Sequence, residues 1–461
     1  MTADEVAAER RQVPEATAPG RVFRRVLTRP IPVAVRGHGA EIWDADGRRY
    51  LDAAGGAIVV NVGHGRESVA HAMADQASRI AFAHGSAFTS EALEAYAAEL
   101  GPLLPLDEPA IYPVSGGSEA IESALKMARA YHIARGEPGR QIVISRWGSY
   151  HGNTLGALDL SGRAPLRRPY EAWLGRFRHV SAAYPYRADE PDAHALGTAE
   201  DAAAELDRVI ATAGPTEVCA FVAEPIVGAT LGAVSPPPGY WPAIAEVCRR
   251  HGVLLIADEV MTGFGRTGRW FAMEGFGVRP DILVAAKGAT GGYWPFGFAA
   301  ADRPVYEAIR EQGSFVHGFT YSHSVVGAAV AREVLRILRA EDLVAAAARQ
   351  GKLLASELHA AFDDHPHVGE VRSAGLMAAI ELVADRETKR PFPRSRQVTE
   401  HALAAGRELG VIFYSGTGNA NGVDGDIVMI GPPFVVTDEQ VGEIAAAMRE
   451  AVDRAVATPA G

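Results

Sequence analysis

Cysteine, long apolar runs and excess positive charge are all scarce in this 461-residue chain. Its only two cysteines, Cys219 and Cys248, match neither a disulfide framework nor the spacing of metal ligands, so we expect no metal. No apolar run approaches the roughly 18 residues that a membrane span needs. The net charge of −11 argues against nucleic acid or an anionic membrane as a main partner. Residues 1–5 are acidic and polar, unlike a signal peptide, and we therefore expect a cytoplasmic protein.

The composition predicts a large folded enzyme. Hydrophobic residues make up 48% of the chain, which is enough for a sizeable core and for more than one domain. The 49 glycines are typical of an α/β protein with many tight turns between strands and helices. We expect residues 1–20 to form a flexible tail, and the residues after Val456 to be loose as well.

A short apolar run ends at Lys287. Residues 282–286 read Ile-Leu-Val-Ala-Ala between Asp281 and the lysine, which predicts a buried strand that meets a loop at Lys287. Burial lowers the pKa of a lysine from its usual value near ~10.4, because the charged form loses solvation. A lysine that is neutral near pH 7 is a nucleophile able to form a Schiff base with an aldehyde. The alternative is a structural lysine whose ammonium reaches solvent.

Two more apolar strands end in carboxylates. Residues 218–224 end in Glu224, and residues 253–259 carry Asp258 near their end, with a helix expected between them over Tyr240–His251. Alternating strands and helices predict a mainly parallel sheet that binds ligands at the carboxyl ends of its strands. Asp258 is suited to hold a protonated ring nitrogen, which is what pyridoxal phosphate chemistry requires. A helix cap or a surface ion pair is the alternative.

A glycine-rich turn at Gly116 and Gly117 joins the apolar strand of residues 110–115 to a segment with helical spacing. The free N–H groups and the positive dipole end at the start of a helix bind phosphate, and Ser118 adds a hydroxyl. An ordinary helix cap is the alternative. The turn lacks the lysine of a P-loop and the spacing of a dinucleotide fingerprint, which disfavours nucleotide binding.

An aromatic pair, Tyr150 and His151, follows the strand expected at residues 141–145. Glycines bracket the pair, which suits it to stacking on a flat ring. A packed tyrosine and a hydrogen-bonded histidine are the alternative, and for His151 we favour that alternative. Ile58 lies in an apolar segment with glycines at both ends, where it is a candidate for a pocket wall.

In this order, these segments resemble the class III pyridoxal-phosphate aminotransferases. The resemblance extends from about residue 23 to residue 455 and is most specific where DEVMTGFGRTG precedes AKG. The motifs that carry it are SGGSEA (residues 115–120), SYHGNT (149–154), AEP (223–225), DEVMTGFGRTG (258–268), AKG (286–288) and GFTYS (318–322).

The resemblance implies a role for each matching residue. Lys287 is expected to hold the cofactor through a Schiff base and to move the proton between the substrate carbon and the cofactor. Asp258 is expected to bind the pyridine nitrogen, with Tyr150 and Val260 against opposite faces of the ring. The other expected cofactor contacts are Gly117, Ser118, His151, Glu224 and Thr320. The expected substrate pocket includes Ile58, Phe88 and Arg163.

The resemblance also implies the fold and the assembly. We expect a fold-type I pyridoxal-phosphate enzyme, similar to aspartate aminotransferase, with a large, mainly parallel-sheet domain and a smaller α/β domain. The large cofactor-binding domain would span residues 71–329, and the small domain residues 21–70 and 330–461. Thr320 in this family reaches the phosphate of the neighbouring subunit, which implies a homodimer with shared active sites.

Departures from the family pattern concern the substrate. Met261 stands where the ornithine- and GABA-type members carry glutamine, and Met429 stands where they carry the arginine that binds the substrate carboxylate. The arginine that omega-amino-acid:pyruvate members often carry before Gly425-Asp426 is also absent, and so is their tryptophan near Ile58. Glu224, which often pairs with such an arginine, is then free to receive a cationic group. We therefore expect a donor whose distal end is not a carboxylate, with Arg163 as a remaining carboxylate contact.

The sequence thus predicts a transaminase that takes an amino group from an amine or omega-amino donor and passes it to pyruvate or 2-oxoglutarate by a ping-pong mechanism. A lyase, decarboxylase or aminomutase on the same fold is one alternative. A non-catalytic binding protein that keeps the fold is a more remote one, against which the presence of both Lys287 and Asp258 weighs.

Overall fold

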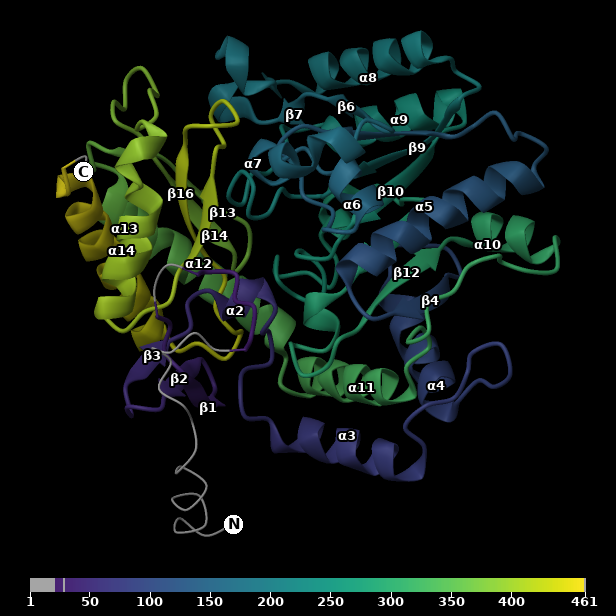
Figure 1. Ribbon diagram of the computed structural model, residues 1–461, viewed down its shortest axis with the longest axis horizontal. Helices are drawn as coiled ribbons and strands as arrows, with labels where there is room; N and C mark the ends of the chain where they lie inside the picture. Colours follow the sequence, from purple (N-terminus) through teal and green to yellow (C-terminus); the bar gives the residue numbers. More distant parts are fainter. Residues whose placement is uncertain (1–20, 28–29, 460–461) are drawn as a thin grey trace.

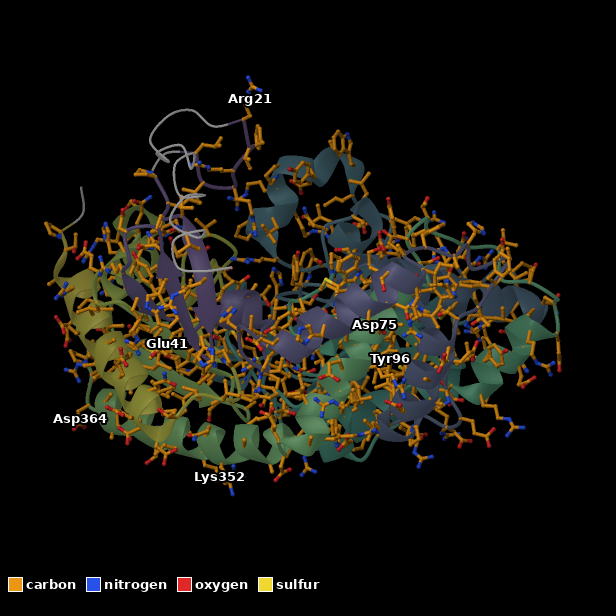
Figure 2. The ribbon with its side chains drawn as sticks, turned by 90° about the horizontal axis from the view of Figure 1, so that it is seen from below. Arg21, Glu41, Asp75, Tyr96, Lys352 and Asp364 are labelled. Atoms are coloured by element: carbon orange, nitrogen blue, oxygen red, sulfur yellow. The ribbon has the colours of Figure 1, made fainter. Side chains whose placement is uncertain are left out.

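The computed structural model describes residues 21–27 and 30–459, and the tail expected at residues 1–20 lies outside this range. Figure 2 shows Tyr96 among packed side chains, whereas Lys352 and Asp364 lie at the surface. In the described part of the chain, no helix combines the length and the hydrophobicity needed to cross a membrane.

A seven-stranded sheet forms the centre of the molecule (Figure 1), in the order β4-β12-β11-β10-β9-β5-β6. Strands β11, β10, β9, β5 and β6 are parallel to one another, and β12 runs antiparallel to β11 and β4. This mostly parallel sheet confirms the predicted α/β class. The strands are β4 (Ala110–Val114), β5 (Ile142–Arg146), β6 (Arg178–Val180), β9 (Val218–Ala223), β10 (Leu254–Asp258), β11 (Ile282–Ala285) and β12 (Gly297–Ala301).

Both faces of this sheet are covered, which explains why its strands read as continuous apolar runs. In β10, Leu254 and Ile256 pack in one hydrophobic cluster with α5 and α10, whereas Leu255 and Ala257 pack in another with α8 and α9. This alternation follows the two-residue period of a strand. The helices around the sheet are α3 (Glu67–Arg79), α4 (Glu91–Leu100), α5 (Gly117–Ala134), α8 (Ala199–Ala213), α9 (Tyr240–His251), α10 (Arg303–Arg310) and α11 (Val325–Ala340).

A second, antiparallel sheet lies beside the first and carries three helices on its outer face (Figure 1). Its strand order is β13-β14-β16-β15. The strands are β13 (Val368–Ser373), β14 (Ala378–Leu382), β15 (Tyr414–Thr417) and β16 (Asp426–Ile430), and the helices are α12 (Leu343–Phe362), α13 (Val398–Glu408) and α14 (Asp438–Ala457).

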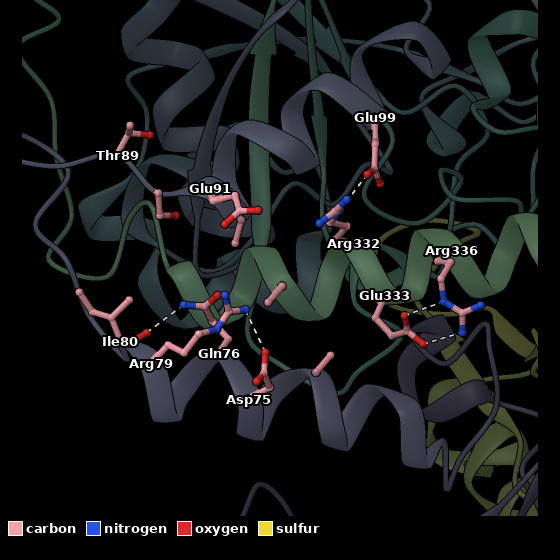
Figure 3. A pocket seen from close by; sticks show the side chains of 14 residues that line it. Asp75, Gln76, Arg79, Ile80, Thr89, Glu91, Glu99, Arg332, Glu333 and Arg336 are labelled. Carbon is pink, nitrogen blue, oxygen red and sulfur yellow. Dashed lines mark hydrogen bonds and ion pairs between the residues drawn. The ribbon is translucent and has the colours of Figure 1, made fainter.

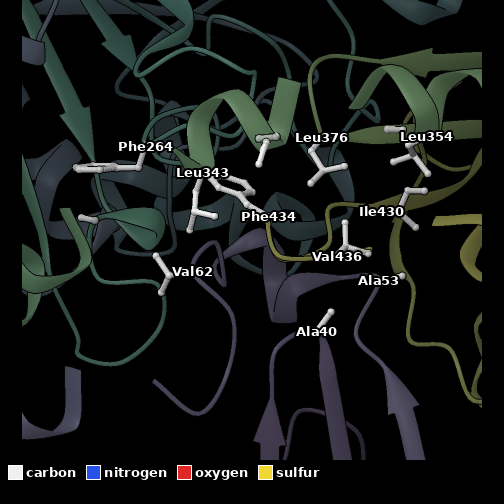
Figure 4. Close-up of a cluster of buried hydrophobic side chains, with 14 of the residues drawn as sticks. Ala40, Ala53, Val62, Phe264, Leu343, Leu354, Leu376, Ile430, Phe434 and Val436 are labelled. Carbon is white, nitrogen blue, oxygen red and sulfur yellow. The ribbon is translucent and has the colours of Figure 1, made fainter. Parts of the chain in front are cut away.

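The N-terminal segment packs against both parts. Strands β1 (Ala34–His38), β2 (Glu41–Asp44) and β3 (Arg49–Leu51) form a small antiparallel sheet, with the β2–β3 hairpin where its Asp-Gly turn predicts it. Figure 4 shows the cluster in which Val62, Phe264 and Ile430, from three distant segments, share one core. The remaining short elements are α2 (Gly55–Ile58), α6 (Leu155–Leu160), α7 (Ala164–Arg167), β7 (Ala182–Ala183) and β8 (Ala195–Leu196).

A buried ionic network joins the second sheet to the segment after β7. Glu381 of β14 accepts hydrogen bonds from Arg187 Nε at 2.5 Å and from Arg372 Nη1 at 2.7 Å, and the Tyr184 hydroxyl bonds to the same carboxylate. All four side chains are buried. Glu190 and Glu370 add a second carboxylate to Arg187 and Arg372, respectively, so that both guanidinium groups are compensated.

Candidate active site

Three strand ends place the candidate catalytic groups at one edge of the central sheet. Strands β9, β10 and β11 are neighbours, with Ala257 paired to Ala223 and Asp258 paired to Val284. Glu224 follows β9 directly, Asp258 ends β10 and Lys287 follows β11 after one residue. Because the strands are parallel, all three side chains leave the sheet at its carboxyl edge, where open α/β sheets bind ligands.

Lys287 carries the amine of the site. Burial lowers the pKa of Lys287 to about 8, although the nearby charges of Asp258 and Glu224 raise it. Its backbone φ of 43° lies in the left-handed region, which is unusual for a residue with a side chain and frequent at functional sites. Asn61 fixes the turn beyond it by donating a 2.9 Å hydrogen bond from Nδ2 to the carbonyl oxygen of Gly288.

Asp258 is buried and held by two hydrogen bonds. Its Oδ1 accepts from the backbone N–H of Val260 at 3.0 Å, and its Oδ2 lies 2.7 Å from Nδ1 of His151. His151 Nε2 lies 3.0 Å from Ser145 Oγ, whose hydroxyl is free to donate because the Ser149 hydroxyl donates to the carbonyl oxygen of Arg146. Nδ1 of His151 therefore carries the proton that it donates to Asp258.

Glu224 is a buried carboxylate with an unsatisfied oxygen. Among the described residues, its Oε2 has no hydrogen-bond partner, and the nearest cation is Arg146 Nη2 at 4.0 Å. Burial raises the pKa of Glu224 to about 7, against the lowering effect of His151 and Arg146. A buried acceptor without a donor is costly, so this oxygen is available to a donor group on a ligand.

The glycine-rich turn begins α5 as predicted. A Cβ at Gly117 would lie 3.1 Å from Val260 Cγ1, so the start of α5 packs tightly against the loop that follows Asp258. Ser118 Oγ accepts a 3.0 Å hydrogen bond from the N–H of Asn153, which ties the loop of Tyr150 to the same helix end. The first-turn N–H groups of α5 have no acceptor within the helix and are suited to an anion.

The remaining predicted residues lie in different environments. Tyr150 is 38% exposed and Phe88 is 70% exposed, while Thr320 lies exposed on the loop before α11. Ile58 is 2% exposed and packs in an apolar cluster with Met429 and Met261. Met261 and Met429, which stand where related sequences carry polar substrate ligands, are therefore part of an apolar cluster.

Sequence reasoning missed Asn61 and Ser145. Asn61 interrupts the apolar run of residues 57–62, and a polar residue buried in such a run needs partners, which is the signal that would have identified it. Ser145 ends an apolar strand with no motif of its own. Its hydrogen bond to His151 depends on how the loop folds back, and the sequence carries no sign of this contact.

A separate cavity of about 660 Å³ lies between α3, α4 and α11 (Figure 3). Its arginines are paired with carboxylates, in the pairs Arg79–Asp75, Arg332–Glu99 and Arg336–Glu333. None of Lys287, Asp258 or Glu224 lines it. Its arginines are already compensated and it holds none of the candidate catalytic groups, so it is not the site of the chemistry.

Pyridoxal phosphate fits the residues at the carboxyl edge. An amine with a pKa of about 8, a carboxylate on the neighbouring strand and the free N–H groups of α5 match the aldehyde, the ring nitrogen and the phosphate in chemistry. The fold and this donor set together define a pyridoxal-phosphate enzyme of fold-type I.

The chain belongs to the class III aminotransferases, which depend on pyridoxal phosphate: residues 25–452 match the family described as "Aminotransferase class-III". It is 39% identical over 428 residues to an uncharacterized aminotransferase of Bacillus subtilis, YodT, covering 92% of this chain and 96% of that one. It is 33% identical to the putrescine–pyruvate aminotransferase of Pseudomonas aeruginosa, covering 94% and 93% of the two chains. The solved structure of an (S)-enantioselective omega-transaminase from Thermomicrobium roseum superimposes with a TM-score of 0.85 at 36% identity, covering 99% and 98%. The protein is a transaminase, as the motifs predicted.

Proposed function

We propose that this transaminase takes its amino group from an amine or omega-amino donor whose distal end carries no carboxylate. The apolar wall of Ile58, Met261 and Met429 supports this proposal, because it offers no cation to a distal carboxylate. The unpartnered Oε2 of Glu224 offers an acceptor to a donor with a second amino group. The similarity to a putrescine–pyruvate aminotransferase agrees with such a donor. The acceptor is a keto acid such as pyruvate or 2-oxoglutarate.

The proposed roles of the residues rest mainly on one observation. The amine of Lys287 lies near the carboxylate of Asp258 at the carboxyl edge of the sheet. Lys287 would hold the cofactor through its amine and would move the proton at the substrate carbon, for which a pKa of about 8 suits it. Asp258 would bind the ring nitrogen, and the hydrogen bond from His151 keeps its carboxylate in place. When bound, pyridoxal phosphate supplies an electron sink for the substrate carbon.

Other side chains hold the cofactor without taking part in proton transfer. Tyr150 and Val260 cover the two faces of the ring, and Glu224 lies near it. The amides at Gly117 and Ser118 bind the phosphate at the start of α5.

We also propose a homodimer in which Thr320 contacts the phosphate of the partner's site. Thr320 is exposed in the single chain, and exposed apolar side chains lie near it in sequence or in contact with its loop. Val316 and Tyr321 flank it, and the ring of Phe82 meets the ring of Tyr321 edge to face at 6.2 Å. An exposed apolar group of this kind is typical of a subunit interface.

The predicted division into a large domain (residues 71–329) and a small domain (residues 21–70 and 330–461) remains part of the proposal. So does the cytoplasmic location, with which the two free, buried cysteines agree.

The visible absorption spectrum of the protein with pyridoxal phosphate tests the function. An amine donor added without a keto acid should remove the absorption of the bound cofactor, and pyruvate or 2-oxoglutarate should restore it. Lys287→Ala should abolish turnover, whereas Lys352→Ala, at an exposed position of α12, should not. Turnover by Lys287→Ala at the wild-type rate would remove Lys287 from the proposed role. Donor consumption without any spectral change would indicate a lyase or decarboxylase instead.

A further inference from the structure

A cavity of about 260 Å³ lies between the loop that contains Arg163, the loop of Thr230 and residues 417–422 after β15. Its volume is below the roughly 300 Å³ at which pockets for whole drug-sized ligands begin, so it suits one end of a substrate. The catalytic residues do not line it. Of its polar side chains, only Arg163 has an expected role, as a carboxylate contact.

Arg163 is a cation without a counter-ion. In residues 21–27 and 30–459, its side chain forms no ion pair or hydrogen bond, and its Nε is buried without a partner. Burial lowers the pKa of Arg163, the hydroxyl groups of Tyr414 and Tyr150 raise it, and the positive charge of Arg25 lowers it further. A guanidinium that loses solvation next to a second cation is stabilised by an anion, and no carboxylate of the described residues pairs with it.

The exposed Asp192 also lines the cavity, but no ion pair joins it to Arg163 in the described structure. His194 borders the cavity as well and is exposed. Neither residue compensates the guanidinium.

Two neutral side chains that line the same cavity also have polar atoms without hydrogen-bond partners. Asn419 is 6% exposed and both its Oδ1 and Nδ2 lack partners, and Thr230 is 3% exposed with an unpartnered Oγ1. The amide NH₂, the hydroxyl and the guanidinium are all donors. Three donors from separate loops around one small cavity match the two acceptor oxygens of a carboxylate, which guanidinium binds in a planar, bidentate manner.

Tyr150 connects this cavity to the candidate active site. Burial is the main cause that raises the pKa of Tyr150. The nearby charges that also act on its pKa include those of Arg163 and Asp258. Tyr150 also directly precedes His151, which is hydrogen-bonded to Asp258. The backbone N–H of His151 also donates a 2.8 Å hydrogen bond to Ser161, two residues before Arg163, so the segment that carries Arg163 lies against the candidate active site.

We propose that Arg163, together with Asn419 and Thr230, binds the carboxylate of the keto acid acceptor. This inference rests on the proposed transaminase function and adds the residues that recognise the acid. The donor and the acceptor use one site in turn, so a pocket with an apolar wall and a separate cationic end accommodates an amine in the first half-reaction and an acid in the second.

The test compares Arg163→Met with wild-type holoenzyme, using Arg178→Met as the control at an exposed position of β6. The KM for 2-oxoglutarate should rise about 10- to 100-fold, the loss expected for a charge-assisted hydrogen bond. The half-reaction with butylamine, which has no carboxylate, should be unchanged. Arg163→Lys, which keeps the charge but not the planar fork, should give an intermediate KM.

Calorimetric binding of glutarate to the holoenzyme gives a readout that does not need turnover. Arg163→Met and Asn419→Ala should each weaken glutarate binding about tenfold or more. Asn419→Ala should not lower the melting temperature, because it removes unsatisfied polar atoms rather than a contact. Unchanged glutarate affinity in both variants would overturn the subsite, even if transamination by the wild type were normal. Competition by inorganic phosphate at matched ionic strength would overturn its assignment to a carboxylate. Absence of transamination in the wild type would instead refute the proposed function, and the glutarate measurement would still decide the subsite.

Discussion

Lys287→Met should stabilise the protein once the cofactor has been removed. Burial lowers the pKa of Lys287 from 10.5 to about 8. The folded state therefore disfavours the ammonium by about 3 kcal/mol, since each pH unit of pKa shift corresponds to about 1.36 kcal/mol. Methionine has a similar length and no charge, so the variant does not carry this cost.

The gain should depend on pH in a defined direction. Below the folded pKa of about 8, the lysine is protonated in both the folded and the unfolded protein, and the full difference between variant and wild type is present. As the pH rises toward 10.5, the folded lysine loses its proton while the unfolded lysine keeps it, and the wild type recovers the lost stability. Above pH 10.5, the charge of Lys287 should no longer contribute to the difference in unfolding free energy between the variant and the wild type.

Urea denaturation of the apoprotein at several pH values measures this difference. Lys352→Met is the control, because Lys352 is exposed on α12 (Figure 2) and should show no such gain. Comparison of each variant with wild type at the same pH cancels the titration of all other groups. A variant that is less stable than wild type at neutral pH, or a gain that does not decline in alkali, would refute the reasoning about Lys287.

Two further changes test other parts of the site. Asp258→Asn should reduce kcat about 10²- to 10³-fold while cofactor binding persists, because the amide has no negative charge to hold the ring nitrogen protonated; full activity would remove Asp258 from that role. Thr320→Ala should raise the Kd for pyridoxal phosphate about tenfold, the loss of one hydrogen bond to a charged group, without changing the molecular mass in sedimentation. An unchanged Kd would place Thr320 away from the phosphate.

Strands β9, β10 and β11 were predictable because each is buried on both faces and so reads as an apolar run with a polar residue at or near its end. Those ends predict Glu224, Asp258 and Lys287 at one edge of the sheet, which is where they lie. The β2–β3 hairpin and α9 were likewise encoded locally, by an Asp-Gly turn and by helical spacing.

Contacts between distant segments were not predictable. His151 lies 107 residues from Asp258 in the sequence, and Asn61 lies 227 residues from Gly288. Their hydrogen bonds depend on strand order and on loop paths, which no local pattern records. Exposed Phe88 shows the converse, since its sequence position suggested a pocket and the single chain leaves its ring in solvent.

The buried network around Glu381 constrains how this protein can change over evolutionary time. Loss of Glu381 alone removes the fully buried carboxylate and leaves Arg187 and Arg372 paired only with the partly exposed Glu190 and Glu370. A buried ion pair that loses one member costs about 3–5 kcal/mol. Replacement of all the charged members by apolar side chains of similar volume is far cheaper. Substitution of one member at a time is disfavoured because each intermediate is less stable. These positions should therefore be inherited as a set, or exchanged together when relatives diverge.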